Sequence, residues 1–130
     1  MNILHKSLKS DNTPNILIYG HPGINKRNIL INELNKLYHI ETISKTTLND
    51  IMYTKTNIYY EFNIKTISNK NYDNFVQIIK NITISKNYYT DLKNKIIILN
   101  NFNGSKKNQN ILRVIIEKYR STTIFILITD

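Results

Sequence analysis

The chain has 130 residues, the length of one domain, and a net charge of +9 that favours polyanionic partners, nucleic acid above all. Lysine-rich codon usage explains the same charge, and both interpretations stay open. The sequence contains no cysteine, which excludes disulfides and thiol chemistry, and no apolar run of about 18 residues that could span a membrane. The three histidines lack the spacing of metal ligands, so no metal site made by protein ligands is expected.

The first half of the chain is predicted to hold an arm, a strand and a helix. Residues 1–13 are expected to form a short helix or arm, and the apolar run at 15–19 a buried strand that ends at a glycine. A helix is predicted from Lys26, because apolar residues recur at helical spacing at Ile29, Leu30, Leu34, Leu37 and Tyr38. Residues 40–56 are ambiguous between a short strand and an irregular insertion.

The second half alternates strands and helices. Strands are predicted at 57–64, 95–100 and 123–129, with a turn around Gly104. Two helices lie between them, marked by Phe75, Ile78, Ile79 and Ile82 and by Ile111, Leu112, Ile115, Ile116 and Tyr119. This order predicts an α/β fold, a three-layer sandwich with a mostly parallel sheet of four to five strands and helices on both faces. Ligands of such sheets bind beyond the carboxyl ends of the strands.

The stretch "GHPGINKRN" follows the first strand and opens the first helix, as a phosphate-binding loop does. Asn25 stands where the pattern has its second glycine, and we expect it to keep the loop shape by adopting positive φ. Lys26 would reach the phosphates, with the positive end of the helix beside it. The candidate nucleotide-binding residues are Gly20, Pro22, Gly23, Ile24, Asn25, Lys26, Arg27 and Asn28. An ordinary strand-to-helix turn is the alternative.

Arg27 replaces the serine or threonine whose hydroxyl holds Mg²⁺ in phosphate-binding loops. A guanidinium repels the ion and is able to fork onto phosphate oxygens in its place. The strand at 95–100 leads into Asn100 and Asn101, at the positions where P-loop ATPases carry acidic residues. An amide cannot accept a proton from water, so no catalytic residue is assigned. We expect weak binding of ATP or ADP, without Mg²⁺.

Two segments resemble the small subunits of replication factor C, the eukaryotic and archaeal sliding-clamp loader of the AAA+ family. "QNILRVIIEKYRSTTIFILITD" resembles a Q-x-x-L-R-x-x-x-E-K-Y segment and the strand after it, through Gln109, Leu112, Arg113, Glu117, Lys118 and Tyr119. "PNILIYGHPGINKRNIL" resembles the phosphate-loop segment of the family, and Arg27 sits where one small subunit has a basic residue. The likeness covers about residues 14–130 and is weak in its middle.

The resemblance implies a degenerate AAA+ domain at 14–130, with Asp130 at the sensor position. It implies that the lid and collar domains are missing, as in a fragment or a reduced homologue from a large DNA virus or another AT-rich genome. The family fold has a further strand beside the first one, so the strand at 15–19 is expected to be an open edge. Partners would be other clamp-loader subunits, the sliding clamp and primer–template DNA, with no membrane. Lys65 and Lys70 are candidate DNA contacts.

The favoured function is therefore a structural or weakly nucleotide-binding clamp-loader-like protein in DNA replication, with little or no hydrolysis. It would act inside the cell, in the nucleus or at a cytoplasmic replication site such as a viral factory. The alternatives are an active P-loop ATPase or nucleotide kinase, and an interaction module that kept the fold but binds no nucleotide. Glu33 and Glu61 have no special claim to act as a catalytic base in the active alternative.

Overall fold

The structure is a computed structural model that describes residues 16–19, 25–41, 43–85, 95–101, 106–120 and 122–129. Its strands are β1 (Ile16–Tyr19), β2 (Ile43–Leu48), β3 (Ile51–Thr56), β4 (Tyr59–Asn63), β5 (Lys95–Asn100) and β6 (Thr123–Thr129). Its helices are α2 (Lys26–Tyr38), α3 (Tyr72–Ile84) and α4 (Lys106–Lys118), with short 3-10 turns η1 (Ile64–Thr66) and η2 (Asn69–Asn71) before α3. The expected arm at 1–13 and the turn at Gly104 lie outside the described residues.

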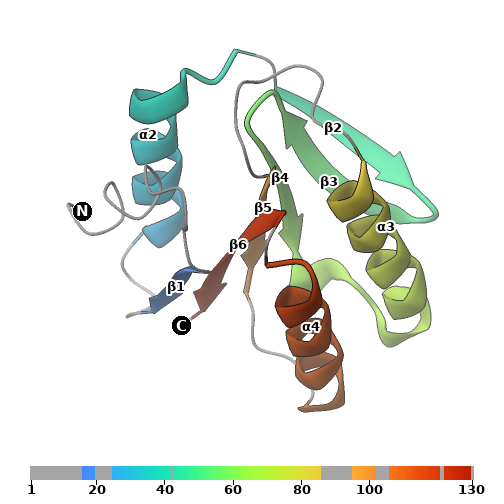
Figure 1. Ribbon diagram of the computed structural model, residues 1–130. Coiled ribbons are helices and arrows are strands. Elements are labelled where there is room, and N and C mark those ends of the chain that lie inside the picture. Colours follow the sequence, from blue (N-terminus) through green and yellow to red (C-terminus); the bar gives the residue numbers. More distant parts are fainter. Residues whose placement is uncertain are drawn as a thin grey trace.

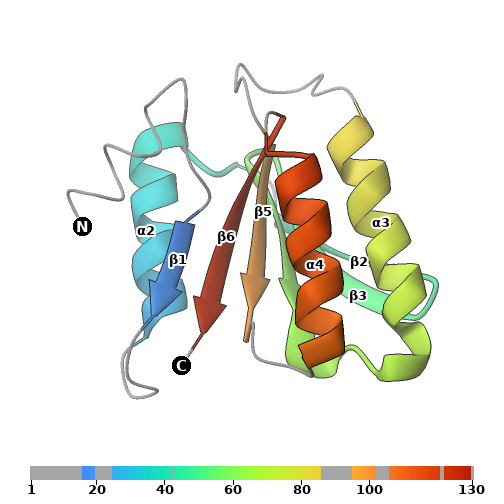
Figure 2. The ribbon, with the colours of Figure 1, turned by 60° about the horizontal axis from the view of Figure 1, so that its bottom comes forward.

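The strands form one sheet in the order β1-β6-β5-β4-β3-β2. The pairs β1–β6, β6–β5 and β5–β4 are parallel, whereas β4–β3 and β3–β2 are antiparallel. Helix α2 covers one face, and α3 and α4 cover the other, so the predicted three layers are confirmed (Figures 1 and 2). Each apolar β5 residue from Ile96 to Leu99 is buried, because both faces of this central strand are covered.

The expected count of four to five strands is wrong, because the ambiguous stretch at 40–56 folds into the β2–β3 hairpin. Its two-residue turn is formed by Asn49 and Asp50, with φ of 50° and 63°. Two left-handed residues in such a turn match the right-handed twist of the strands, and Asn and Asp tolerate this conformation better than most other residues. The dipeptide "ND" was the hairpin signal in the sequence.

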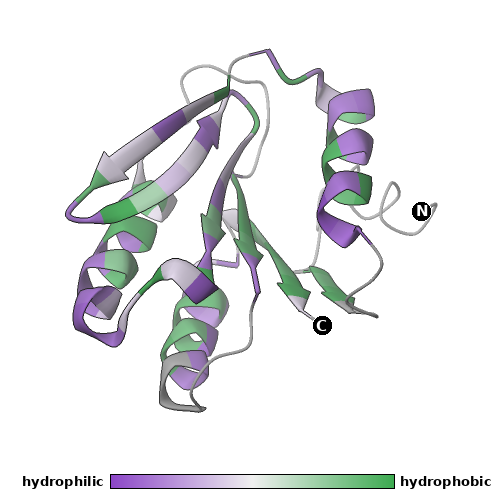
Figure 3. Cartoon of the chain, turned by 180° about the vertical axis from the view of Figure 1, so that it is seen from behind, coloured by the Kyte–Doolittle hydropathy of each residue, from purple (hydrophilic) through white to green (hydrophobic). Residues whose placement is uncertain are grey.

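Two apolar clusters hold the layers together, and Figure 3 shows the central strands as mostly hydrophobic. The larger one lies between the sheet and α3 and α4, where Phe62, Phe75 and Tyr72 pack edge to face with ring centroids 5.4 and 5.5 Å apart. The smaller one lies under α2 and contains Leu30 and Leu34. The predicted helical stripes therefore lie mostly on the buried faces of the helices, but the prediction for Ile29 of the α2 stripe is wrong, because its side chain is 37% exposed.

Strand β1 ends the sheet in the described part of the chain and pairs with β6. Its Leu17 side chain is 61% exposed, which is unusual for a leucine in a parallel strand. Within the described residues, the expected open edge at 15–19 is therefore present.

Candidate functional site

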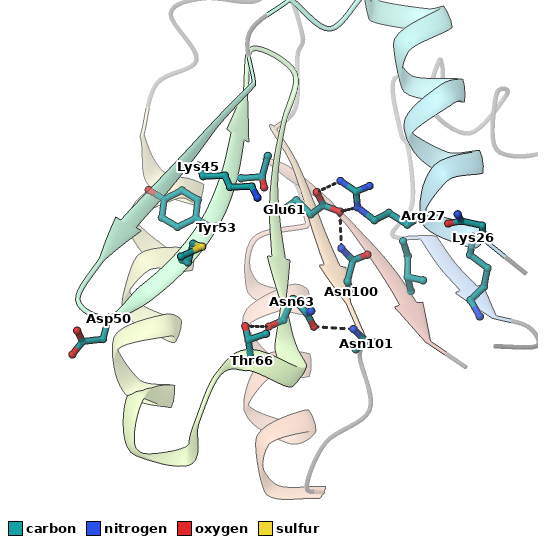
Figure 4. A pocket seen from close by; sticks show the side chains of 14 residues that line it. Lys26, Arg27, Lys45, Asp50, Tyr53, Glu61, Asn63, Thr66, Asn100 and Asn101 are labelled. Carbon is teal, nitrogen blue, oxygen red and sulfur yellow. Dashed lines mark hydrogen bonds and ion pairs between the residues drawn. The ribbon is translucent and has the colours of Figure 1, made fainter. Parts of the chain in front are cut away.

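The candidate site lies where β4 and β5 reach their carboxyl ends and where α2 begins. A cavity of about 710 Å³ opens there (Figure 4). Its lining includes Arg27 from α2, Glu61 and Asn63 from β4, and Asn100 and Asn101 from the end of β5. Parallel strands place their carboxyl ends at one edge of the sheet. Arg27 therefore meets side chains in this cavity that lie 34 to 74 positions later in the sequence. Its volume lies within the roughly 300–1,000 Å³ of small-molecule sites.

Asn25 begins α2 as its N-cap residue and does not adopt the positive φ that we expected. Its φ is −80°, and its side-chain oxygen accepts a hydrogen bond from the Asn28 N–H at 3.3 Å. That bond satisfies one of the free amide donors at the start of the helix, which is why asparagine is favoured at this position. The expected left-handed conformation of Asn25 is therefore wrong, and the residue serves as the cap of α2.

Arg27 forms a two-point ion pair with Glu61. Its Nε donates to Glu61 Oε2, and its Nη2 donates to Oε1 at 2.8 Å. The Glu61 side chain is 5% exposed, whereas that of Arg27 is 46% exposed. The hydrogen bond to Glu61 is the main cause that raises the pKa of the Arg27 guanidinium above its usual value. Arg27 was expected to fork onto phosphate oxygens, and in this structure it forks onto a carboxylate.

Two asparagines link the strand ends beside this ion pair. Asn100 Nδ2 donates to Glu61 Oε2 at 2.6 Å, and Asn101 Nδ2 donates to Asn63 Oδ1 at 2.8 Å. The Oδ1 atom of Asn100 is buried without a hydrogen-bond partner among the described residues. The negative charge of Glu61 fixes this amide orientation, because the flipped amide would set oxygen against carboxylate. Both asparagines thus act as hydrogen-bond donors at the end of β5.

The arrangement joins a cationic side chain to a buried carboxylate beside the cavity. Glu61 accepts hydrogen bonds from Arg27 and from Asn100, so its charge is paired with a cation inside the protein. Lys26 is 7% exposed, and its side chain extends away from Arg27 (Figure 4). Lys45 of β2 lines the cavity on the other side of Glu61.

The structure brings only part of the predicted site together. Asn25, Lys26 and Arg27 line the cavity with Asn100 and Asn101. Lys65 in η1 and Lys70 in η2 are exposed. Gly20, Pro22, Gly23, Ile24 and Asp130 lie outside the described residues, and Asn28 lies in the first turn of α2. Within the described ranges, no three metal-ligating side chains gather, and no helix is long and apolar enough to cross a membrane.

Sequence reasoning missed Glu61, Asn63 and the hairpin wall of the cavity. Glu61 lies within the otherwise aromatic stretch "YYEF" of β4, and it is one of the few charged residues buried in the described part of the chain. A buried carboxylate needs a charged or hydrogen-bonding partner, so its place in a predicted strand was a usable signal. The partner could not be found from sequence, because Arg27 is 34 residues away.

No protein-family model matches the chain. The chain is similar to replication factor C subunit 2 of Saccharomyces cerevisiae, with 30% identity over 137 aligned positions. The alignment covers 100% of this chain and 36% of the relative, so the chain spans about a third of the length of the curated relative that it matches. This similarity over the whole chain supports a clamp-loader-like relationship.

Proposed function

We propose that the protein is a clamp-loader-like domain of DNA replication that binds a nucleotide weakly and hydrolyses it little or not at all. Two observations support this function. The chain is similar to a replication factor C subunit over its full length. The candidate cavity lies at the carboxyl ends of parallel strands and at the start of a helix, where phosphate groups bind in P-loop folds.

The ion pair between Arg27 and Glu61 is the observation that carries the proposal. A guanidinium stands at the start of α2, where the hydroxyl that holds Mg²⁺ would be, and its charge is paired with the Glu61 carboxylate. The residues at 100 and 101 are amides, which neither bind a divalent cation strongly nor accept a proton from water. The proposed site therefore binds phosphate through cationic and amide donors, without a metal.

Nucleotide binding with and without metal tests the proposal. Calorimetric titration of ATP and ADP into the protein should give similar dissociation constants in Mg²⁺ and in EDTA, and Lys26→Ala should weaken binding. Lys65→Ala, which removes an exposed lysine outside the cavity, is the matched control and should bind normally. Strict dependence on Mg²⁺ would contradict the role of Arg27. ATP turnover that is lost in Lys26→Ala would favour an active P-loop ATPase or nucleotide kinase instead.

The proposed partners are other clamp-loader subunits, a sliding clamp and primer–template DNA. The net charge of +9 supports contacts with a phosphate backbone, and exposed Lys65 and Lys70 are the proposed contacts. Their double replacement by alanine should weaken DNA binding and lower its salt dependence. If the double variant binds DNA as tightly as the wild type at every salt concentration, these lysines do not contact DNA.

A nucleotide-free interaction module is the second candidate, because Arg27 already has an anionic partner inside the protein. A ligand that binds only the folded state raises its stability. Thermal unfolding with and without millimolar ATP separates the two functions. A melting temperature that does not change in millimolar ATP would favour the interaction module.

A further inference from the structure

We propose that Glu61 limits the affinity of the anion site, as an internal carboxylate that a phosphate must displace in order to use the Nε–Nη2 edge of Arg27. This inference rests on the proposed function, since it assumes that the cavity binds phosphate. It adds the residue that sets how much affinity the site retains. The contact costs every anion that takes this edge the same free energy, so only anions that otherwise bind tightly, such as the metal-free phosphate chain of a nucleotide, stay measurably bound.

Glu61 occupies one of the edges of Arg27 that can bind a phosphate. Nε and Nη2 of Arg27 form an edge that binds carboxylates and phosphates in two-point contacts, and both donate to Glu61. A phosphate that takes this edge has to release the carboxylate. The contact with Glu61 therefore lowers the affinity of every anion that takes this edge by the same factor.

The burial of the two partners indicates which one moves. Glu61 is on the central strand β4, is 5% exposed and is held by the 2.6 Å hydrogen bond from Asn100. Arg27 is in the first turn of α2, is 46% exposed and has a long side chain with several rotatable bonds. Arg27 can therefore swing toward a ligand while the carboxylate stays in place.

A buried carboxylate that loses its cation needs another partner. Lys45 of β2 lines the same cavity and lies on the opposite side of Glu61 from Arg27 (Figure 4). The amide of Asn100 remains bonded to the carboxylate. These two groups reduce the cost of releasing Arg27, so displacement by a strongly charged ligand is feasible.

The test compares binding of tripolyphosphate and inorganic phosphate in EDTA by calorimetric titration. Glu61→Gln removes the charge, and Glu61→Asp keeps the charge but shortens its reach toward Arg27 by one methylene. We expect Glu61→Gln to bind tripolyphosphate about tenfold more tightly than the wild type, in line with the loss of one competing charge-assisted contact. Glu61→Asp should gain severalfold, and inorganic phosphate should gain by about the same factor as tripolyphosphate in this variant, because both ligands displace the same contact.

Two controls isolate the contact with Arg27. Glu33→Gln removes a carboxylate from α2, the helix that carries Arg27, and should leave binding nearly unchanged. The Oε1 atom of Glu33 lies 3.6 Å from Lys36 Nζ. In an Arg27→Met background, Glu61→Asp should give no gain, because the competition that it relieves is absent. A gain of affinity cannot arise from a damaged fold, so partial unfolding does not mimic the expected result.

Each remaining outcome overturns a defined part of the inference. Unchanged or weaker binding in both Glu61 variants would show that the carboxylate does not compete. A gain in Glu61→Gln alone would show simple charge repulsion and not competition for Arg27. Both results leave the proposed function intact if Lys26→Ala still weakens ATP binding. Absence of phosphate and nucleotide binding in the wild type and in every variant would overturn the proposed function together with this inference.

Discussion

Arg27 and Glu61 are 34 residues apart in sequence and form a two-point ion pair in which one partner is buried and the other is half exposed. The pair joins the first turn of α2 to the middle of the sheet. Removing one partner therefore costs a different amount of stability from removing the other, because an unpaired charge in the interior costs more than an unpaired charge in water.

Arg27→Met should therefore destabilise the protein more than Glu61→Gln. The first change leaves the Glu61 carboxylate buried with Asn100 as its remaining donor, and we expect a loss of about 2 kcal/mol, reduced from a fully buried pair because Arg27 is half exposed. The second leaves a guanidinium that water can reach, and about 0.5 kcal/mol is expected. Urea unfolding measures both, with Lys36→Met as the exposed control. The opposite order of losses would contradict the burial of Glu61.

Asn100→Asp should be more harmful than Asn101→Asp. The first change sets a second carboxylate at hydrogen-bond distance from Glu61, where the amide donates at 2.6 Å, and we expect a loss of about 2 kcal/mol at neutral pH. Asn101 is bonded to a neutral partner, Asn63, at an exposed contact, so about 0.5 kcal/mol is expected. The free energy of unfolding of the two variants provides the comparison. Equal losses would show that Glu61 does not dictate the amide at position 100.

Tyr72 should make the protein sensitive to alkali. Burial raises the pKa of Tyr72 to about 12, whereas an unfolded tyrosine ionises near 10. The folded state favours the neutral phenol, so its contribution is complete below about pH 10 and is lost as the pH rises toward about 12. Tyr72→Phe should flatten this part of the stability curve by about 2 kcal/mol. Chemical unfolding of the wild type and the variant between pH 9 and 12 measures this difference. Parallel curves of unfolding free energy against pH would contradict the role of Tyr72.

Asp50→Gly should stabilise the β2–β3 hairpin. Asp50 has a φ of 63° in a two-residue turn, and glycine adopts this conformation without steric cost. A gain of about 0.5 kcal/mol in the free energy of unfolding is expected. Asp73→Gly, in the first turn of α3, is the matched control and should lose about 1 kcal/mol. A loss in both variants would mean that the Asp50 side chain has a role beyond the turn.

The order of strands and helices could be predicted from sequence because each element depends on local patterns. Apolar runs marked β1, β5 and β6, and helical spacing of apolar residues marked α2, α3 and α4. The hairpin was ambiguous because its strands are mostly exposed and polar, as in "SKTT", so burial imposed no alternating pattern on them. The turn residues Asn49 and Asp50 carried the only local signal.

The candidate site shows where local patterns stop being informative. The sequence by itself determined a basic helix start at Lys26 and Arg27 after an apolar strand, and amides in place of acids at 100 and 101. Only the tertiary structure decided that Arg27 faces Glu61, that Asn100 donates to the same carboxylate, and that Asn25 caps a helix with negative φ. The physical reason is that ion pairing and burial depend on distance in space, and parallel strand ends bring together residues that sequence spacing keeps far apart.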